Sequence, residues 1–171
     1  TIANLADHII VEWNRKVPAA MKGFHDIFEP LDPPHRLPLT LMTPSDRMGS
    51  PVIKVDPDKI LCVVETFRDD EVGGFTPSDE VTDKIGENVA NFLATELKEG
   101  RIPAEFLPIQ SGVGNIANAV MSSLGKHPGI PNFQMYTEVV QDSVIELVNK
   151  GKITFASGCS WTITTPVLRS I

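Results

Sequence analysis

After residue 50, the hydrophobic and polar positions of the chain alternate between a strand pattern and a helix pattern. Within the predicted strand at 59–66, residues 60–64 form a continuous apolar run, as expected for a strand buried on both faces. A helix pattern follows, with apolar residues at helical spacing up to Gly100: Val81, Ile85, Val89, Phe92, Leu93 and Leu97. We predict that Thr76 caps this helix, with Pro77 at its first position.

The same alternation continues to the end of the chain. It predicts, in order, a strand at 104–110, a helix at 115–124, a strand at 132–138, a helix from about 140 to 150, and a strand with a glycine turn at 152–163. Gly125 and Gly151 are expected to end the two helices. Strands that alternate with helices favour a mostly parallel sheet flanked by helices, so the predicted fold class is α/β.

The first 50 residues follow no such rhythm. Residues 8–14 have a strand pattern, and residues 51–56 predict another short strand. Between them prolines recur, and each removes a backbone donor that a helix interior or a central strand requires. We interpret residues 29–50 as a connector between two units.

Charge and hydropathy exclude two classes of function. The chain has 15 Lys and Arg against 22 Asp and Glu, giving a net charge of −7. We expect no nucleic-acid partner, because phosphate binding requires a basic surface. The chain contains no run of about 18 apolar residues, so we expect neither a membrane span nor a membrane partner.

Cysteine and histidine usage predicts neither a disulfide framework nor a metal site. Cys62 and Cys159 are isolated, which is typical of a reducing compartment. The histidines are scattered, without the spacing of metal ligands: His8, His25, His35 and His127.

A glycine-containing turn at 110–120, "QSGVGNIANAV", is the first candidate for chemistry. Gly112 and Gly114 permit a tight turn, and the helix that follows directs unpaired amides into it. Such a turn favours negative charge, either a pyrophosphate or an oxyanion that forms in a transition state. A plain strand-to-helix turn explains the glycines equally well.

Glu138 is the second candidate, because it stands where the predicted strand at 132–138 gives way to a helix. A helix dipole stabilises a carboxylate at this place in its ionised form, which a carboxylate nucleophile requires. Acids are also common there merely to compensate the dipole. The following acid, Asp142, is interpreted as solvated helix surface.

Taken together, the two sites also fit a dinucleotide-binding module. "GVGNIA" matches G-x-G-x-x-A, and Glu138 lies where a ribose-binding acid would stand. Pro108 within the preceding strand weakens this alternative, as do the strands and the helix predicted ahead of it.

The segments "LPIQSGVGNIANAV" and "YTEVVQDSVIELVNKGKITFASG" resemble the acetyl-CoA hydrolase/transferase family. This family comprises class I coenzyme A transferases, including succinyl-CoA:acetate and 4-hydroxybutyrate CoA-transferases. Further similar motifs occur in order: "IIVEWN", "HDIFEP", "SDRMGSP", "DPDKI" and "VET".

The resemblance implies an acyl-CoA enzyme whose nucleophile is Glu138. In the family this glutamate attacks the thioester to form an acyl-glutamyl anhydride, and returning CoA forms a glutamyl-CoA thioester. The "GVGN" turn matches the loop near the thioester, which makes Gly112, Gly114, Asn115 and Ile116 the candidate oxyanion- and CoA-binding residues. No bound cofactor is implied, because the coenzyme A thioester is the substrate.

The resemblance also implies how the chain is organised. The family has two similar α/β halves, so residues 1–40 would end the first half and include its connector, and residues 41–171 would begin the second half. The chain begins at Thr1 and is expected to be an internal fragment. Expected partners are an acyl-CoA, a small carboxylate such as acetate or succinate, and a second copy in a homo-oligomer. The expected location is mitochondrial or cytoplasmic.

Overall fold

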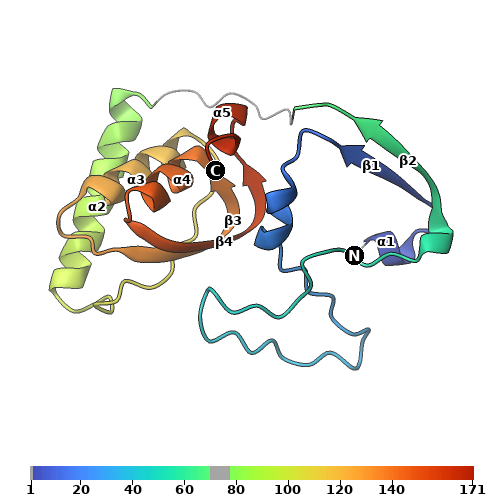
Figure 1. Ribbon diagram of the computed structural model, residues 1–171. Helices are drawn as coiled ribbons and strands as arrows, with labels where there is room; N and C mark the ends of the chain where they lie inside the picture. Colours follow the sequence, from blue (N-terminus) through green and yellow to red (C-terminus); the bar gives the residue numbers. More distant parts are fainter. Residues whose placement is uncertain (1, 70–77) are drawn as a thin grey trace. The chain divides into compact units, whose positions relative to one another are not determined.

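The computed structural model describes residues 2–69 and 78–171 (Figure 1). The chain divides into two compact units, Thr1–Met42 with Asp46–Asp70, and Thr43–Ser45 with Glu71–Ile171. The predicted helix cap at Thr76 and Pro77 lies outside the described residues. The division predicted at 40/41 concerns the halves of a longer fold and stays a prediction.

The first unit is built on one parallel pair of strands, β1 (Ile9–Asn14) and β2 (Ile60–Thr66). The other elements of this unit are short: helix α1 (Ile2–Leu5) and the 3-10 turns Ala19–Phe24 and Pro57–Lys59. The strands predicted at 8–14 and 59–66 are therefore present.

The burial predicted for β2 is wrong within the described chain. The side chains of Leu61 and Val64, which lie on opposite faces of the strand, are 63% and 46% exposed. Two strands alone cannot cover both of their own faces, since each face requires a packed layer.

The strand predicted at 51–56 is also absent. Ser50 instead forms an isolated antiparallel bridge with Ile27, and the Asp26 carboxylate accepts hydrogen bonds from the backbone N–H groups of Met48 and Gly49. The end of the connector is thus folded back onto residues 26–27.

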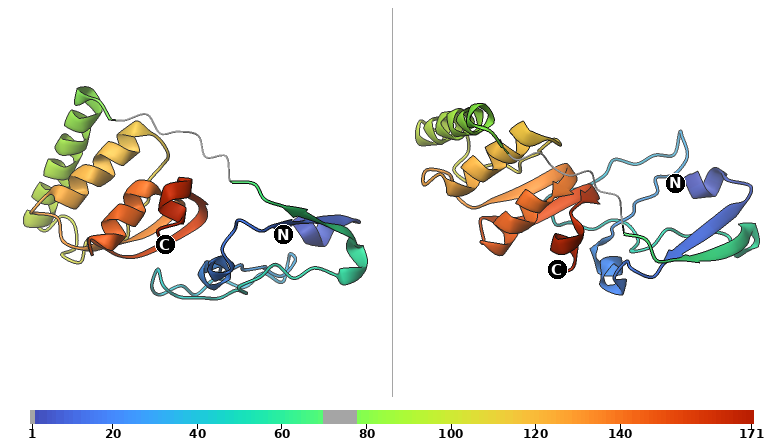
Figure 2. Two further views of the ribbon diagram at one scale, coloured as in Figure 1. Left: turned by 45° about the horizontal axis from the view of Figure 1, so that its top comes forward. Right: turned by 90° about the horizontal axis from the view of Figure 1, so that it is seen from above.

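The second unit contains the α/β alternation. Its elements are α2 (Glu80–Lys98), α3 (Asn115–Lys126), β3 (Phe133–Gln141), α4 (Asp142–Asn149), β4 (Ile153–Thr162) and α5 (Thr165–Leu168). Strands β3 and β4 pair in parallel, joined through α4, while α2 and α3 pack side by side (Figure 2). The predicted α/β class with parallel strands is confirmed.

The core of the second unit lies between these helices and the β3–β4 pair. Its largest fully buried side chains include Phe133, Met135, Met121 and Leu124. Phe133 meets Phe106 edge to face, with 5.7 Å between the ring centroids. Of the apolar residues that predicted α2, Leu93 and Leu97 pack against this cluster, whereas Val81 and Phe92 are 67% and 60% exposed.

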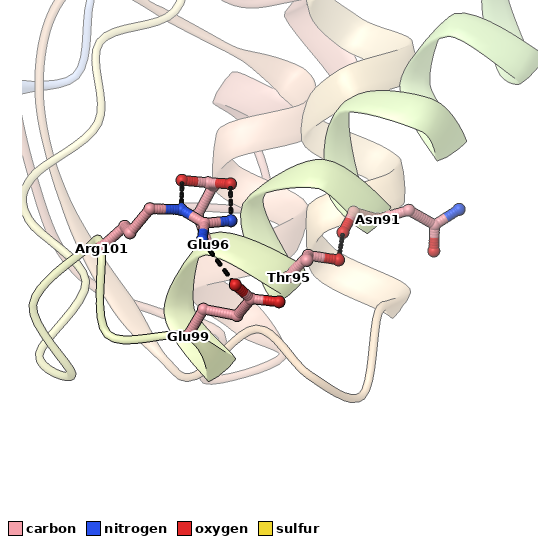
Figure 3. A network of polar contacts seen from close by, with 5 residues as sticks. All are labelled: Asn91, Thr95, Glu96, Glu99 and Arg101. Carbon is pink, nitrogen blue, oxygen red and sulfur yellow. Dashed lines mark hydrogen bonds and ion pairs between the residues drawn. The ribbon is translucent and has the colours of Figure 1, made fainter.

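Both ends of α2 are stabilised locally. Asp79 and Thr82 form a capping box at its start, and hydrogen bonds from Thr82 lower the pKa of the Asp79 carboxyl. Just beyond its end, Arg101 donates two hydrogen bonds to Glu96 and one to Glu99 (Figure 3). The bonds from Arg101 lower the pKa of Glu96, and those carboxylates raise the pKa of Arg101.

Three predictions for this unit are wrong: a strand, the end of a helix and a turn. Residues 104–110 form no strand, and Ile109 alone bridges to Met135 of β3. Helix α3 continues through Gly125 to Lys126. The glycine turn predicted after residue 152 is absent, because Gly158 lies within β4 and pairs with Thr137.

Candidate active site

Glu138 lies inside strand β3, three residues before the strand ends at Gln141. The first turn of α4 instead begins with Asp142. The prediction that Glu138 stands at a helix mouth is therefore wrong, and the dipole of α4 does not account for its position. Any role for Glu138 must rest on its place in the strand.

The Glu138 side chain is exposed, between the buried Thr137 and Val139. Alternation along the strand explains this, because successive side chains point to opposite faces. Within residues 2–69 and 78–171, the carboxylate has neither a hydrogen-bond nor an ion-pair partner. It is thus open to a ligand, as a nucleophile would have to be.

The glycine turn leads directly into α3. Gly114 is the residue before the helix and has φ = 122°, a conformation that strains other residues. No side chain caps this end, and the first backbone donor that returns to the turn is the N–H of Asn118, bonded to the Gly114 carbonyl. The amides of Asn115 and Ile116 in the first turn are therefore left for other partners.

Two side chains of β3 bind the same turn. The Thr137 hydroxyl donates a hydrogen bond to the Ser111 carbonyl (3.0 Å) and accepts one from the Ser111 N–H (3.2 Å). The Gln141 amide donates to the Gly112 carbonyl (2.8 Å). The structure thus brings the predicted glycine turn together with the strand that carries Glu138, but the Glu138 side chain points to the opposite face of β3 from the side chains that bind the turn.

Sequence reasoning missed Ser111, Thr137 and Gln141. All three are polar but buried, at 7%, 6% and 2% exposure. A signal was present in the strand pattern, because Thr137 and Gln141 share the parity of the apolar Phe133, Met135 and Val139. Polar residues at core positions require hydrogen-bond partners, so this pattern predicts that Thr137 and Gln141 form specific hydrogen bonds.

A cleft of about 550 Å³ borders the turn on the side of the helices. Its lining is mainly apolar and includes Leu93, Phe106 and Met121, and it also includes Ser111 and Gly112. Because the turn faces open space here, close packing does not hold it in place. The hydrogen bonds to β3 therefore hold the turn in place instead.

Two neighbouring polar residues have structural partners. The Asp142 carboxylate accepts hydrogen bonds from the N–H and the hydroxyl of Thr164, both at 2.8 Å, and so holds the start of α5. Its interpretation as solvated helix surface is wrong. The Asn118 side chain accepts a hydrogen bond from Ser143, which links α3 to α4.

In the described part of the chain, no three or more His, Cys, Asp and Glu residues are grouped as metal ligands. None of the helices among these residues has the length and hydropathy to cross a membrane.

The chain is similar over nearly its whole length to enzymes that act on acyl-CoA. It is 43% identical to a propanoyl-CoA:succinate CoA transferase of Escherichia coli, over 97% of this chain and 34% of that protein. It is 40% identical to an acetyl-CoA hydrolase of Yarrowia lipolytica, over 95% of this chain and 31% of that protein. No protein-family model matches the chain.

A solved structure, the 4-hydroxybutyrate CoA-transferase of Porphyromonas gingivalis, aligns with 88% of this chain and 28% of its own, at 18% identity and a TM-score of 0.49. The chain spans about a third of the length of the curated relatives it matches.

These relatives place the chain among the homologues of enzymes that transfer or hydrolyse CoA thioesters. The resemblance to the acetyl-CoA hydrolase/transferase family is thereby confirmed. The dinucleotide-binding alternative is not favoured. The segment that enters the turn forms a single bridge rather than the first strand of a Rossmann unit.

Proposed function

We propose that the chain forms part of an acyl-CoA:carboxylate CoA-transferase or an acetyl-CoA hydrolase, with Glu138 as the nucleophile. The observation that carries the proposal is the open, unpaired carboxylate of Glu138 on a strand whose other face binds the glycine turn. The similarity to CoA transferases and acetyl-CoA hydrolases supports this reaction class.

In the proposed first step, a Glu138 oxygen attacks the thioester carbonyl and the C–S bond breaks. CoA leaves as a thiolate, and the acyl group becomes a mixed anhydride with Glu138. The thiolate then attacks the glutamyl carbonyl, which releases the acyl group as a carboxylate and forms a glutamyl-CoA thioester. In a transferase, an acceptor carboxylate then attacks the glutamyl-CoA thioester and the two steps run in reverse, which gives the CoA thioester of the acceptor. In a hydrolase, water instead cleaves the mixed anhydride between the acyl group and Glu138, and CoA leaves as the free thiol.

The glycine turn is proposed to stabilise the oxyanion that forms in each attack. Backbone amides near Gly112, Gly114, Asn115 and Ile116 are the candidate donors, because the first amides of α3 have no partner in its own turn. A well-placed donor contributes roughly 3 to 4 kcal/mol to such a transition state. No resident cofactor is required, since the CoA thioester itself is the substrate.

The remaining features of the proposal follow the resemblance. The acceptor would be a small carboxylate such as acetate or succinate, and the assembly would be a homo-oligomer. The enzyme would act in the mitochondrion or the cytoplasm. Product analysis with acetyl-CoA, in the presence and absence of succinate, separates transfer from hydrolysis.

The nucleophile is tested by trapping it in the full-length protein. Incubation with acetyl-CoA followed by borohydride reduces a glutamyl thioester to an alcohol, which peptide mass spectrometry locates. We expect the modification at Glu138 in the wild type, its loss in Glu138→Gln, and a fall in turnover of at least about a thousand-fold.

Glu146→Gln is a matched control, because Glu146 is an exposed glutamate on α4 whose ion pair is with Lys150. It should keep both the adduct and the activity. Trapping of a different residue, or full activity of Glu138→Gln, would show that the proposed nucleophile is wrong.

A further inference from the structure

Thr137 and Gln141 lie on either side of Glu138 along β3, and both are polar side chains buried in an otherwise apolar face. Buried polar groups are costly unless they are hydrogen-bonded. Their hydrogen bonds are directed to consecutive residues, Ser111 and Gly112. Two positions of one strand thus hold one short stretch of the glycine turn.

The contact of Thr137 continues a backbone ladder. Ile109 donates its N–H to the Gln134 carbonyl and accepts from the N–H of Tyr136, as a neighbouring strand would. At Ser111, where the next backbone pair of the ladder would form, the Thr137 hydroxyl bonds both the N–H and the carbonyl of Ser111 in place of backbone groups. A hydroxyl can donate and accept at once, so serine could replace threonine here and valine could not.

The contact of Gln141 fixes the orientation of its side-chain amide. Only the nitrogen can donate to the Gly112 carbonyl, so the oxygen must point elsewhere. That oxygen is buried and has no hydrogen-bond partner in the described part of the chain. Gln141 is therefore not optimal for stability, which suggests a reason other than packing for an amide at this position.

The two contacts determine where the amides of the turn point. A trans peptide is planar, with its N–H opposite to its C=O. The Ser111 carbonyl shares a peptide plane with the Gly112 N–H, and the Gly112 carbonyl shares one with the N–H of Val113. Because both carbonyls are turned to the Thr137 and Gln141 side chains, both N–H groups are turned away from those side chains.

We propose that Thr137 and Gln141 are positioning residues, which hold the peptides of residues 111–113 in the orientation that oxyanion stabilisation requires. The inference rests on the proposed function of Glu138 and of the glycine turn. Neither side chain is assigned a role in the bond-making steps.

Turnover by the full-length protein tests the role of Thr137. Loss of one well-placed oxyanion donor lowers kcat by about 10² to 10³, so a misoriented turn in Thr137→Val should lower kcat by about 10- to 100-fold. KM for acetyl-CoA should stay within about 3-fold, since positioning affects the transition state rather than binding. Thr137→Ser retains the hydroxyl and should restore kcat to within about 3-fold.

Thr154→Val is the matched control. The Thr154 hydroxyl bonds the Phe133 carbonyl in the same sheet, at the opposite end of β3 from Gln141. This variant loses a comparable hydrogen bond without touching the turn. If it lowered kcat as much as Thr137→Val, a general loss of stability would explain the result and the proposal would be overturned.

Gln141→Leu separates positioning from stability. Leucine removes the unpartnered oxygen, and the exposed Gly112 is free to bond water instead. The midpoint of urea unfolding should therefore be unchanged or slightly raised, while kcat falls. Unchanged kcat in Gln141→Leu would contradict the proposal.

Hydrogen exchange distinguishes failure of this inference from failure of the proposed function. Amides in peptides spanning 109–116 should exchange faster in Thr137→Val and Gln141→Leu than in the wild type and in Thr154→Val. Faster exchange together with a fully active Glu138→Gln would show that Glu138 is not the nucleophile but that Thr137 and Gln141 do hold the turn in place. Unchanged exchange would refute that hold whatever the activity of Glu138→Gln.

Discussion

Gly86→Ala is expected to destabilise the contact between α2 and α3. Gly86 is buried on α2, and a methyl group added there would lie 2.6 Å from the Ala119 carbonyl oxygen and 2.8 Å from its carbon. The shorter contact is 0.8 Å less than the 3.4 Å at which ordinary contact begins. These two atoms belong to the backbone of α3, and the third near atom is the Ser123 Oγ at 2.8 Å, so side-chain rotation cannot relieve the whole overlap.

Two opposing effects set the magnitude. Overpacking of a close contact typically costs about 1 to 3 kcal/mol, while alanine is favoured over glycine in a helix by about 1 kcal/mol. We therefore expect the free energy of unfolding to fall by about 1 kcal/mol, and by no more than about 2 kcal/mol. For a chain of this length, 1 kcal/mol corresponds to a decrease in Tm of about 2 to 4 °C.

Urea unfolding, followed by far-ultraviolet circular dichroism, measures this change. Gly125→Ala provides the comparison, because its added methyl would meet mainly the Cδ2 atom of Leu147, the end of a flexible side chain. It should cost less than Gly86→Ala, since Leu147 can turn aside. If Gly86→Ala proved more stable than the wild type, or if Gly125→Ala were the more damaging, the backbone-contact argument would be refuted.

Two further predictions concern hydrogen bonds at helix starts. The pKa of Asp79 is lower in the folded chain than its ordinary value of 3.8. Its ionised carboxylate therefore contributes fully to the free energy of unfolding above pH 3.8, and this contribution is lost as the pH falls through the lower pKa of the folded state. Asp79→Ala should therefore reduce stability at neutral pH and weaken the fall in the free energy of unfolding at acid pH, as measured by urea unfolding at several pH values. The same pH dependence in the wild type and the variant would contradict the role of Asp79 as the helix cap. Asp142→Ala removes both hydrogen bonds to Thr164 and should cost about 1 to 3 kcal/mol, with faster hydrogen exchange in α5. Asp142→Asn keeps one acceptor and should be milder, and equal loss in the two variants would argue against the cap.

Local patterns in the sequence predicted most elements of the second unit. The apolar spacing of α2 and α3 was sufficient to find both helices, because each buries one stripe of side chains. The two glycines before α3 indicated its start correctly, since the positive φ of Gly114 is a local requirement. The family resemblance was likewise contained in the order of short motifs.

The true place of Glu138 depended on a distant partner. Val139, Val140 and Gln141 pair with Ser160, Trp161 and Thr162, which extends β3 beyond the residue where the sequence predicts a helix. Residues 51–56 show the opposite case: their pattern suits a strand, but no neighbouring strand pairs with them among the described residues. Backbone pairing, and not side-chain pattern alone, decides where a strand ends.

The sequence by itself determined the α/β class, the helices α2 and α3 and the glycine turn, and its resemblance to a known family suggested Glu138 as the candidate nucleophile. Only the tertiary structure placed Ser111 against Thr137, 26 residues further along the chain, and Gly112 against Gln141. The physical reason is that periodicity reports which face of an element avoids water. The hydrogen-bond partner of a buried polar group is chosen by packing, which brings distant segments together.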